Sequence, residues 1–147
     1  RSVSMKTRGI VAMAGTFGYE LDITRLSQEE KDMVKIQVEE FKKYYSLIQQ
    51  GDYYRLTDDG RKSPYVAWEF AAEDGTEALL NVVTLRVRAY AMPYTVRING
   101  LKPEAVYEVE GTGEKYSGAA LMNGGYLLPV IWDDYQSVQV HFVECCE

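Results

Sequence analysis

The spacing of apolar residues changes once along this chain, near residue 51, and that change limits the folds it can adopt. Before the change the period is helical. Ser27 and Glu30 have the spacing of a capping box, in which the serine hydroxyl accepts the Glu30 amide and the glutamate reaches back. Apolar residues then recur at steps of three and four: Val34, Val38, Phe41, Tyr45 and Ile48. The pattern predicts a helix over residues 28–50, stopped by Gly51.

From residue 52 onward, apolar and polar residues alternate, which is the period of strands with one buried face. The alternating segments are 66–70, 84–89, 96–98, 107–110 and 138–142. Turn sequences separate them: Asp74-Gly75, Asn99-Gly100, Gly111-Thr112-Gly113 and Asn123-Gly124-Gly125. We therefore expect a mainly β fold, an antiparallel Greek-key β-sandwich of seven to eight strands over residues 52–147.

A short, continuous apolar run, Gly-Ile-Val-Ala-Met-Ala, occupies residues 9–14. Such a run predicts a strand that is covered on both faces. Residues 1–51 would then form one strand–helix unit. Because a single strand and a single amphipathic helix cannot bury their own apolar faces, we expect another body of protein to cover them.

Composition excludes several classes of function. The chain has 147 residues, enough for one compact unit with a core, and a net charge of −6. An acidic protein lacks the basic face that a nucleic-acid binder normally shows. No apolar run approaches the roughly 20 residues of a membrane-spanning helix, and the N-terminus lacks the apolar stretch of a secretion signal. We expect no binding to nucleic acid or membranes.

Two neighbouring cysteines, Cys145 and Cys146, and a single histidine, His141, offer no spacing that would hold a metal. We expect ordinary thiols in a reducing, cytoplasmic compartment. Alternation places His141 opposite Val140 and Phe142, so we expect the imidazole to face solvent.

Residues 7–22, which end in Gly18-Tyr19-Glu20-Leu21-Asp22, resemble the end of the catalytic barrel in microbial α-galactosidases (melibiases) of glycoside hydrolase family thirty-six. The similarity continues through residues 50–56, where that family passes from its last barrel helix into its C-terminal domain. Segments 68–70, 116–123 and 135–138 resemble later signatures of that domain. The resemblance covers nearly the whole chain, up to about residue 142.

This resemblance implies that residues 9–14 are the eighth barrel strand, that residues 28–50 are the eighth barrel helix, and that the sandwich is the C-terminal domain. The chain would be a C-terminal fragment of an α-galactosidase, with a structural role. Retaining glycosidases use two carboxyl groups, one as nucleophile and one as acid. In the family both are aspartates on earlier barrel strands, the nucleophile in a Lys-Trp-Asp motif that this sequence lacks.

The resemblance therefore implies an inactive fragment with no catalytic residue, no metal and no other cofactor. Its partner would be the remainder of the barrel, which would act on α-galactoside oligosaccharides of the raffinose type.

Acidic residues within the chain offer no obvious substitute. Ile131-Trp132-Asp133 has isoleucine where the family motif has lysine, and it lies within the predicted sandwich. Adjacent acids on an extended segment point to opposite faces and do not flank one glycosidic bond. We expect three such pairs to be solvated in turns: Asp58–Asp59, Glu73–Asp74 and Asp133–Asp134.

Two sets of residues are candidate sites. The first is the loop of Gly15, Thr16, Phe17 and Gly18, because loops that follow barrel strands border the active site. The alternative for this loop is a tight turn that leads into the helix.

The second set comprises the aromatics Trp132, Tyr126 and Tyr135, which would stack on sugar rings if the chain is a free-standing carbohydrate-binding module. Trp68 shares a face with Val66 and Phe70 and is expected in the core. A further alternative is an interaction module that covers its apolar faces as a homo-oligomer.

Overall fold

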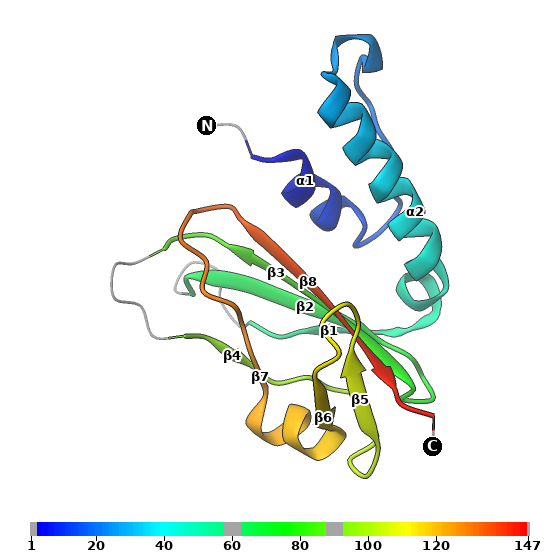
Figure 1. The fold of residues 1–147 in the computed structure, drawn as a ribbon, viewed down its shortest axis with the longest axis vertical. Coiled ribbons are helices and arrows are strands. Elements are labelled where there is room, and N and C mark those ends of the chain that lie inside the picture. The colour runs from blue at the N-terminus through cyan, green and yellow to red at the C-terminus, as the bar shows by residue number, and fades with distance from the viewer. Residues whose placement is uncertain (1–2, 58–62, 88–92, 147) are drawn as a thin grey trace.

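The computed structural model describes residues 3–57, 63–87 and 93–146. It has four helical elements, one of them a short 3₁₀ turn, around two antiparallel sheets (Figure 1). The helical elements are α1 (Met5–Ala12), η1 (Ile23–Arg25, the 3₁₀ turn), α2 (Gln28–Gln50) and η2 (Ala120–Gly124, a π-helical turn). The strands are β1 (Asp52–Arg55), β2 (Tyr65–Ala71), β3 (Glu77–Thr84), β4 (Thr95–Val96), β5 (Val106–Val109), β6 (Lys115–Ser117), β7 (Tyr126–Leu127) and β8 (Ser137–Glu144).

Six strands form the main sheet in the order β1-β2-β3-β8-β5-β6, and β4 pairs with β7 in a small second sheet. Every pairing is antiparallel, as the alternating segments predict. The eight strands of the described residues agree with the predicted seven to eight, but six of them lie in one sheet and two in the other. In the described residues β1, β2 and β3 form a meander, and β8 is inserted between β3 and β5.

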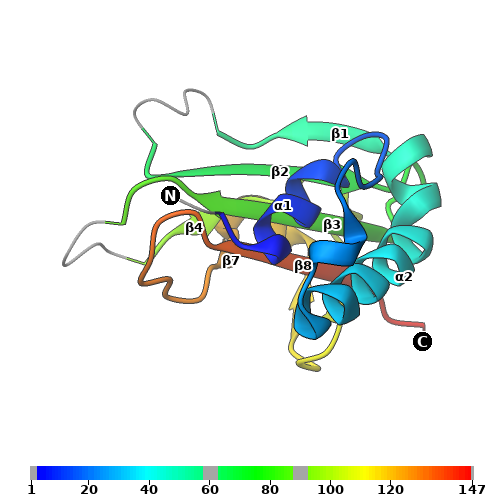
Figure 2. The ribbon, with the colours of Figure 1, turned by 90° about the horizontal axis from the view of Figure 1, so that it is seen from above.

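The main sheet is covered on both faces, so the molecule has three layers (Figures 1 and 2). On one face, α1 and α2 pack over a core that includes Trp68, Phe70 and Leu79. On the other face, the small sheet and η2 cover a larger core that includes Leu80 and Phe142. Trp68 is therefore a core residue, as its alternation with Val66 and Phe70 predicts.

The prediction of a strand over residues 9–14 is wrong, because residues 5–12 form helix α1. A short apolar run fits a buried strand or a buried helix equally well. Here Ser4 Oγ accepts the Thr7 amide at 3.2 Å and caps the helix. Ile10 and Met13, three residues apart, turn inward, whereas Val11 is exposed. The run is thus amphipathic at the helical period.

Helix α2 has the predicted bounds, and both hydrogen bonds of its capping box are present. Its buried face is rotated from the predicted stripe. Tyr44 and Leu47 are buried beside Ile48, whereas Tyr45 is 54% exposed. Apolar side chains of α2 therefore extend beyond the face that packs on the main sheet.

The strand predicted at 84–89 lies earlier in the sequence, at β3. Residues 85–87 are not in a strand, and residues 88 and 89 lie outside the described part of the chain. Seven of the eight β3 residues are buried, so this strand has no polar alternation to reveal it.

His141 is buried rather than solvent-facing, which overturns the prediction from alternation. It lies on the face of β8 that the helical layer covers, and its ring meets Tyr44 of α2 edge to face. Alternation indicates which residues share a face of a strand. It does not indicate whether a second layer covers that face.

Among the described residues, no helix is long and apolar enough to cross a bilayer. Cys145 and Cys146 are both free thiols, as predicted. The cytoplasmic location expected from the sequence stays a prediction.

Candidate functional site

The loop Gly15, Thr16, Phe17 and Gly18 links α1 to the segment that leads into α2. Its Phe17 ring packs against Phe41 of α2 and against Tyr19, with centroid separations of 5.1 and 5.2 Å. Gly15, Thr16 and Gly18 are exposed. The loop therefore lies on the surface of the helical layer and is anchored by one aromatic side chain.

Gln37 holds this layer together from within. It is buried in α2, donates from Nε2 to the carbonyl of Met5 at 2.9 Å, and accepts the Tyr19 hydroxyl. A Cβ on Gly9 would overlap the Gln37 side-chain amide, so glycine is what allows α1 to cross α2 so closely. The loop that contains Phe17 is thus held in place from both ends.

The three aromatics proposed to bind sugar are not one exposed cluster. Trp132 is 82% exposed and Tyr135 is exposed, but Tyr126 is buried. Its ring packs edge to face on Phe142 and Tyr116. Tyr126 is therefore a core residue and does not offer its ring to a sugar.

The loop that carries Trp132 is firmly attached at its base. Thr84 Oγ1 donates to the Asp133 carbonyl at 2.9 Å, and Asp134 Oδ1 accepts the Val87 amide at 2.8 Å. Tyr135 has a φ of 59°, an unusual conformation for a residue other than glycine. The loop presents the exposed indole on a fixed backbone.

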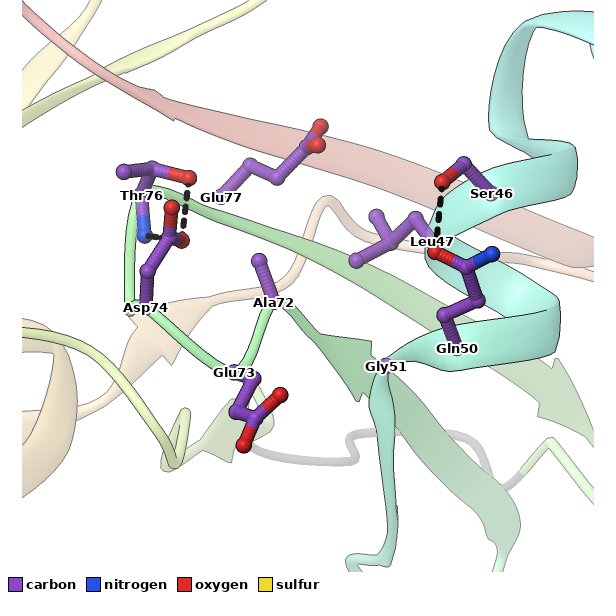
Figure 3. A pocket seen from close by; sticks show the side chains of 9 residues that line it. All are labelled: Ser46, Leu47, Gln50, Gly51, Ala72, Glu73, Asp74, Thr76 and Glu77. Carbon is purple, nitrogen blue, oxygen red and sulfur yellow. Dashed lines mark hydrogen bonds between the residues drawn. The ribbon is translucent and has the colours of Figure 1, made fainter.

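A surface pocket of about 540 Å³ lies where the end of α2 meets the β2–β3 turn (Figure 3). Its walls are the last turn of α2 and the hairpin turn: Ser46, Leu47, Gln50, Gly51, Ala72, Glu73, Asp74, Thr76 and Glu77. Sequence patterns did not identify this pocket, because it is formed by segments that meet only in the fold.

Three carboxylate side chains line the pocket, and two of them already have partners in the chain. Asp74 Oδ1 accepts the amide and the hydroxyl of Thr76 at 3.0 and 2.6 Å, which lowers the pKa of Asp74 (Figure 3). Glu77 Oε2 lies 2.7 Å from His141 Nε2. Within the described ranges, no group of three or more metal-ligating side chains is arranged to hold a metal ion.

Of the other two predicted acid pairs, the structure describes one. Asp133 and Asp134 belong to the base of the Trp132 loop, where Asp134 accepts a backbone amide as a turn residue does. Asp58 and Asp59 lie outside the described residues.

Sequence reasoning missed a buried carboxyl group, Glu69. Its side chain is fully buried in β2, and Oε1 accepts the Asn99 amide at 2.6 Å. Oε2 has no hydrogen-bond partner in the part of the chain that is described. Burial raises the pKa of Glu69 to about 7, the largest cause being loss of water around the charged form. The position of a glutamate between Trp68 and Phe70 is the only sequence signal for this burial.

Two family models match the chain in tandem. A model described as Melibiase matches residues 1–51, and one described as Glycosyl hydrolase family 36 C-terminal domain matches residues 65–142.

Curated relatives are α-galactosidases. The bifunctional α-galactosidase/sucrose kinase AgaSK of Mediterraneibacter gnavus is 45% identical over 147 residues, all of this chain and 16% of the relative. α-Galactosidase AgaA of Geobacillus stearothermophilus is 42% identical over 140 residues, 94% of this chain and 19% of the relative. The chain thus spans less than a fifth of the length of these relatives.

Solved structures agree with the fold over nearly the whole chain. The galactosidase domain of AgaSK superposes with a TM-score of 0.94 at 45% identity, covering 99% of this chain and 20% of that one. An AgaA variant from Geobacillus stearothermophilus in complex with raffinose gives a TM-score of 0.93 at 39% identity, with the same coverage.

Proposed function

Because this chain belongs to glycosyl hydrolase family 36, in which it corresponds to the C-terminal portion of the α-galactosidases, we propose that it completes and supports the catalytic barrel of such an enzyme. Residues 1–51 would be the end of the catalytic domain, and residues 52–147 the domain that follows. The observation that carries this proposal is the tandem order of the two matches along the sequence.

The exposed surface of the helical layer supports a structural role. Val11, Ile23, Ile36 and Tyr45 are large apolar side chains that are more than half exposed on or beside α1 and α2. A mostly apolar groove of about 600 Å³ also runs beside α1, between Val11 and Tyr135. Soluble proteins seldom leave such surface uncovered, and the rest of the barrel would cover it.

The activity of the whole enzyme would be retaining hydrolysis of terminal α-galactosides. The two carboxyl groups that this reaction needs would lie in the preceding part of the barrel. The raffinose complex of the AgaA variant supports α-galactosyl oligosaccharides as the substrate class. This chain alone would have no hydrolytic activity.

A chimera tests this proposal. The matching C-terminal segment of AgaA is replaced by this chain, and hydrolysis of an aryl α-galactoside is measured beside the isolated chain. We expect the chimera to be active and the isolated chain to release no leaving group. A folded chimera without activity, or an active isolated chain, would contradict the proposal.

A matched pair of valine substitutions in the chimera tests where the contact lies. Val11→Asp, on the exposed side of α1, is expected to lower activity by about tenfold or more, because it puts a charge into an apolar contact. Val106, on β5, is similarly exposed, and Val106→Asp should leave activity within about twofold. Circular dichroism of both variants in the isolated chain serves as the folding control.

A second candidate function is favoured by the exposure of Trp132. An indole that is 82% exposed on an anchored loop is suited to stack on the apolar face of a sugar ring. The chain would then bind an oligosaccharide through Trp132, with Tyr135 beside it on the same loop.

Calorimetry with galactose, melibiose and raffinose tests this candidate. If the loop binds sugar, Trp132→Ala should weaken binding by about tenfold or more, which corresponds to loss of one stacking contact. Tyr45→Ala, an exposed aromatic on α2, should leave the affinity unchanged. Absence of binding heat from the unmodified chain at millimolar sugar would refute the candidate.

A further inference from the structure

The single histidine of the chain lies at the contact between α2 and the main sheet. His141, on β8, is 8% exposed, and its ring centroid is 5.0 Å from that of Tyr44 on α2, at 73°. This contact joins the two segments that match different family models.

Both nitrogens of the His141 ring face carboxylate oxygens. Nε2 lies 2.7 Å from Glu77 Oε2 on β3, and Nδ1 lies 3.1 Å from Glu110 Oε2, just after β5. The same Glu110 oxygen accepts from Lys43 Nζ and, at 3.4 Å, from the Tyr44 hydroxyl. One carboxylate therefore bonds both to α2 and to the imidazole.

Hydrogen-bond chemistry fixes what this arrangement requires. An ionised carboxylate only accepts hydrogen bonds, and a neutral imidazole has a single N–H to donate. Both contacts are hydrogen bonds only when the ring carries its second proton. The charges then alternate along the cluster, from the Lys43 ammonium through Glu110 and the imidazolium to Glu77. Removing the proton leaves two carboxylates with one donor between them.

We propose that His141 is a protonation-dependent clamp that holds the C-terminal half of α2 on the β-domain (residues 52–147). With the ring protonated, Glu110 is fixed between His141 and the Lys43–Tyr44 pair, and α2 is held firmly. When the ring loses its proton, one of the two bonds from His141 is lost and α2 loosens. The device would tie the position of the last helix of the N-terminal segment to pH.

Titratable groups from three elements surround the clamp. Those facing it are Glu40, Lys43 and Tyr44 of α2, Glu77 of β3, and Glu110 after β5. The hydrogen bond from Lys43, with a second from His141, lowers the pKa of Glu110. Glu110 therefore stays ionised into acid, and its contribution to stability is lost only as pH falls through that lowered pKa. Because both of its bonds need the protonated ring, the clamp opens as pH rises.

Because the sequence has one histidine, the test can follow its ring directly by NMR in the unmodified chain. The ring resonances of His141 and Tyr44 are recorded from pH 5 to pH 9. We expect both rings to change in the same titration step. A His141 titration that leaves the Tyr44 resonances unmoved would overturn the proposal.

Hydrogen exchange tests whether α2 loosens. The measurement is made in a Glu69→Gln background, which removes a buried carboxyl group whose pKa is raised to about 7. Protection factors of amides 40–48 are expected to fall by about fivefold or more between pH 5.5 and pH 8.5, while those of β2 and β3 stay within about twofold.

Two variants complete the experiment. His141→Gln should make the protection of α2 independent of pH. Lys115→Gln, which removes a cation from an exposed ion pair on β6, should behave as the background does. A His141→Gln profile identical to that of the background would overturn the clamp.

Discussion

Replacing Gly118 with alanine is expected to destabilise the β-domain by about 3 kcal/mol, as overpacking against backbone does. A Cβ at Gly118 would overlap the Lys102 carbonyl oxygen and lie 2.8 Å from its carbon. The neighbouring backbone has little room to move, because the Gly118 amide donates to the Ala105 carbonyl at 2.8 Å and Ala119 donates to Pro103 at 2.9 Å.

Urea denaturation followed by circular dichroism measures this effect, with Gly124→Ala as the matched control. A Cβ at Gly124 meets no atom within 4 Å, so that variant should stay within about 0.5 kcal/mol of the parent chain. Equal midpoints for the two variants would show that the 102–105 turn can shift to admit a methyl group.

Replacing Glu69 with glutamine is expected to remove most of the pH dependence of stability between about pH 4.5 and pH 7. The pKa of Glu69 is raised from 4.5 to about 7 in the folded chain. The neutral form is therefore favoured on folding, and its stabilisation is complete below the unfolded pKa and is lost as pH rises through the folded one. The resulting difference is about 3 kcal/mol between acid and alkaline limits.

Glutamine keeps an oxygen to accept the Asn99 amide and carries no charge at any pH. Its buried NH₂ group has a cost, but that cost is the same across the pH range and leaves the slope unaffected. The free energy of unfolding is measured in urea at intervals from pH 4 to pH 8.5. Glu108→Gln, at a half-exposed position on β5, is the control, and its profile should follow the unmodified chain. If Glu69→Gln keeps the parental slope, Glu69 is not the group responsible.

Local chemistry allowed part of the fold to be predicted from the sequence. The capping box of Ser27 and Glu30 fixed the start of α2, and Gly51 fixed its end. Asp74-Gly75 forms the β2–β3 turn, with Gly75 at a φ of 72°. These features depend on residues within a few positions of each other, so no knowledge of the tertiary structure was needed.

The errors share one cause, which is cover by a layer distant in sequence. Ile10 and Met13 are buried because α1 packs against α2 and β8, and apolarity alone does not distinguish helix from strand. β3 lacks alternation, and His141 and Glu69 are buried, because both faces of the main sheet are covered. The period of a strand shows how its side chains alternate between the two faces of a sheet. It does not show whether another layer covers those faces.

The candidate sites could likewise be predicted where local sequence decides exposure, but not where distant segments meet. The exposure of Trp132 agreed with its place in a turn-rich segment, whereas Tyr126, on short β7, turned inward to Phe142. The pocket between α2 and the β2–β3 turn, and the cluster of Lys43, Glu110 and His141, join residues tens of positions apart. A single sequence gives no signal for such pairs.

The position of β8 between β3 and β5 has a consequence for synthesis on the ribosome. Among the described strands β8 comes last in the sequence and is central, so the meander of β1 to β3 and the hairpin of β5 and β6 emerge as two separate pieces. Until Ser137–Glu144 leaves the exit tunnel, each piece presents an open edge that can pair with other nascent chains. A message truncated before this strand would yield a product for proteolysis rather than a slightly weakened domain.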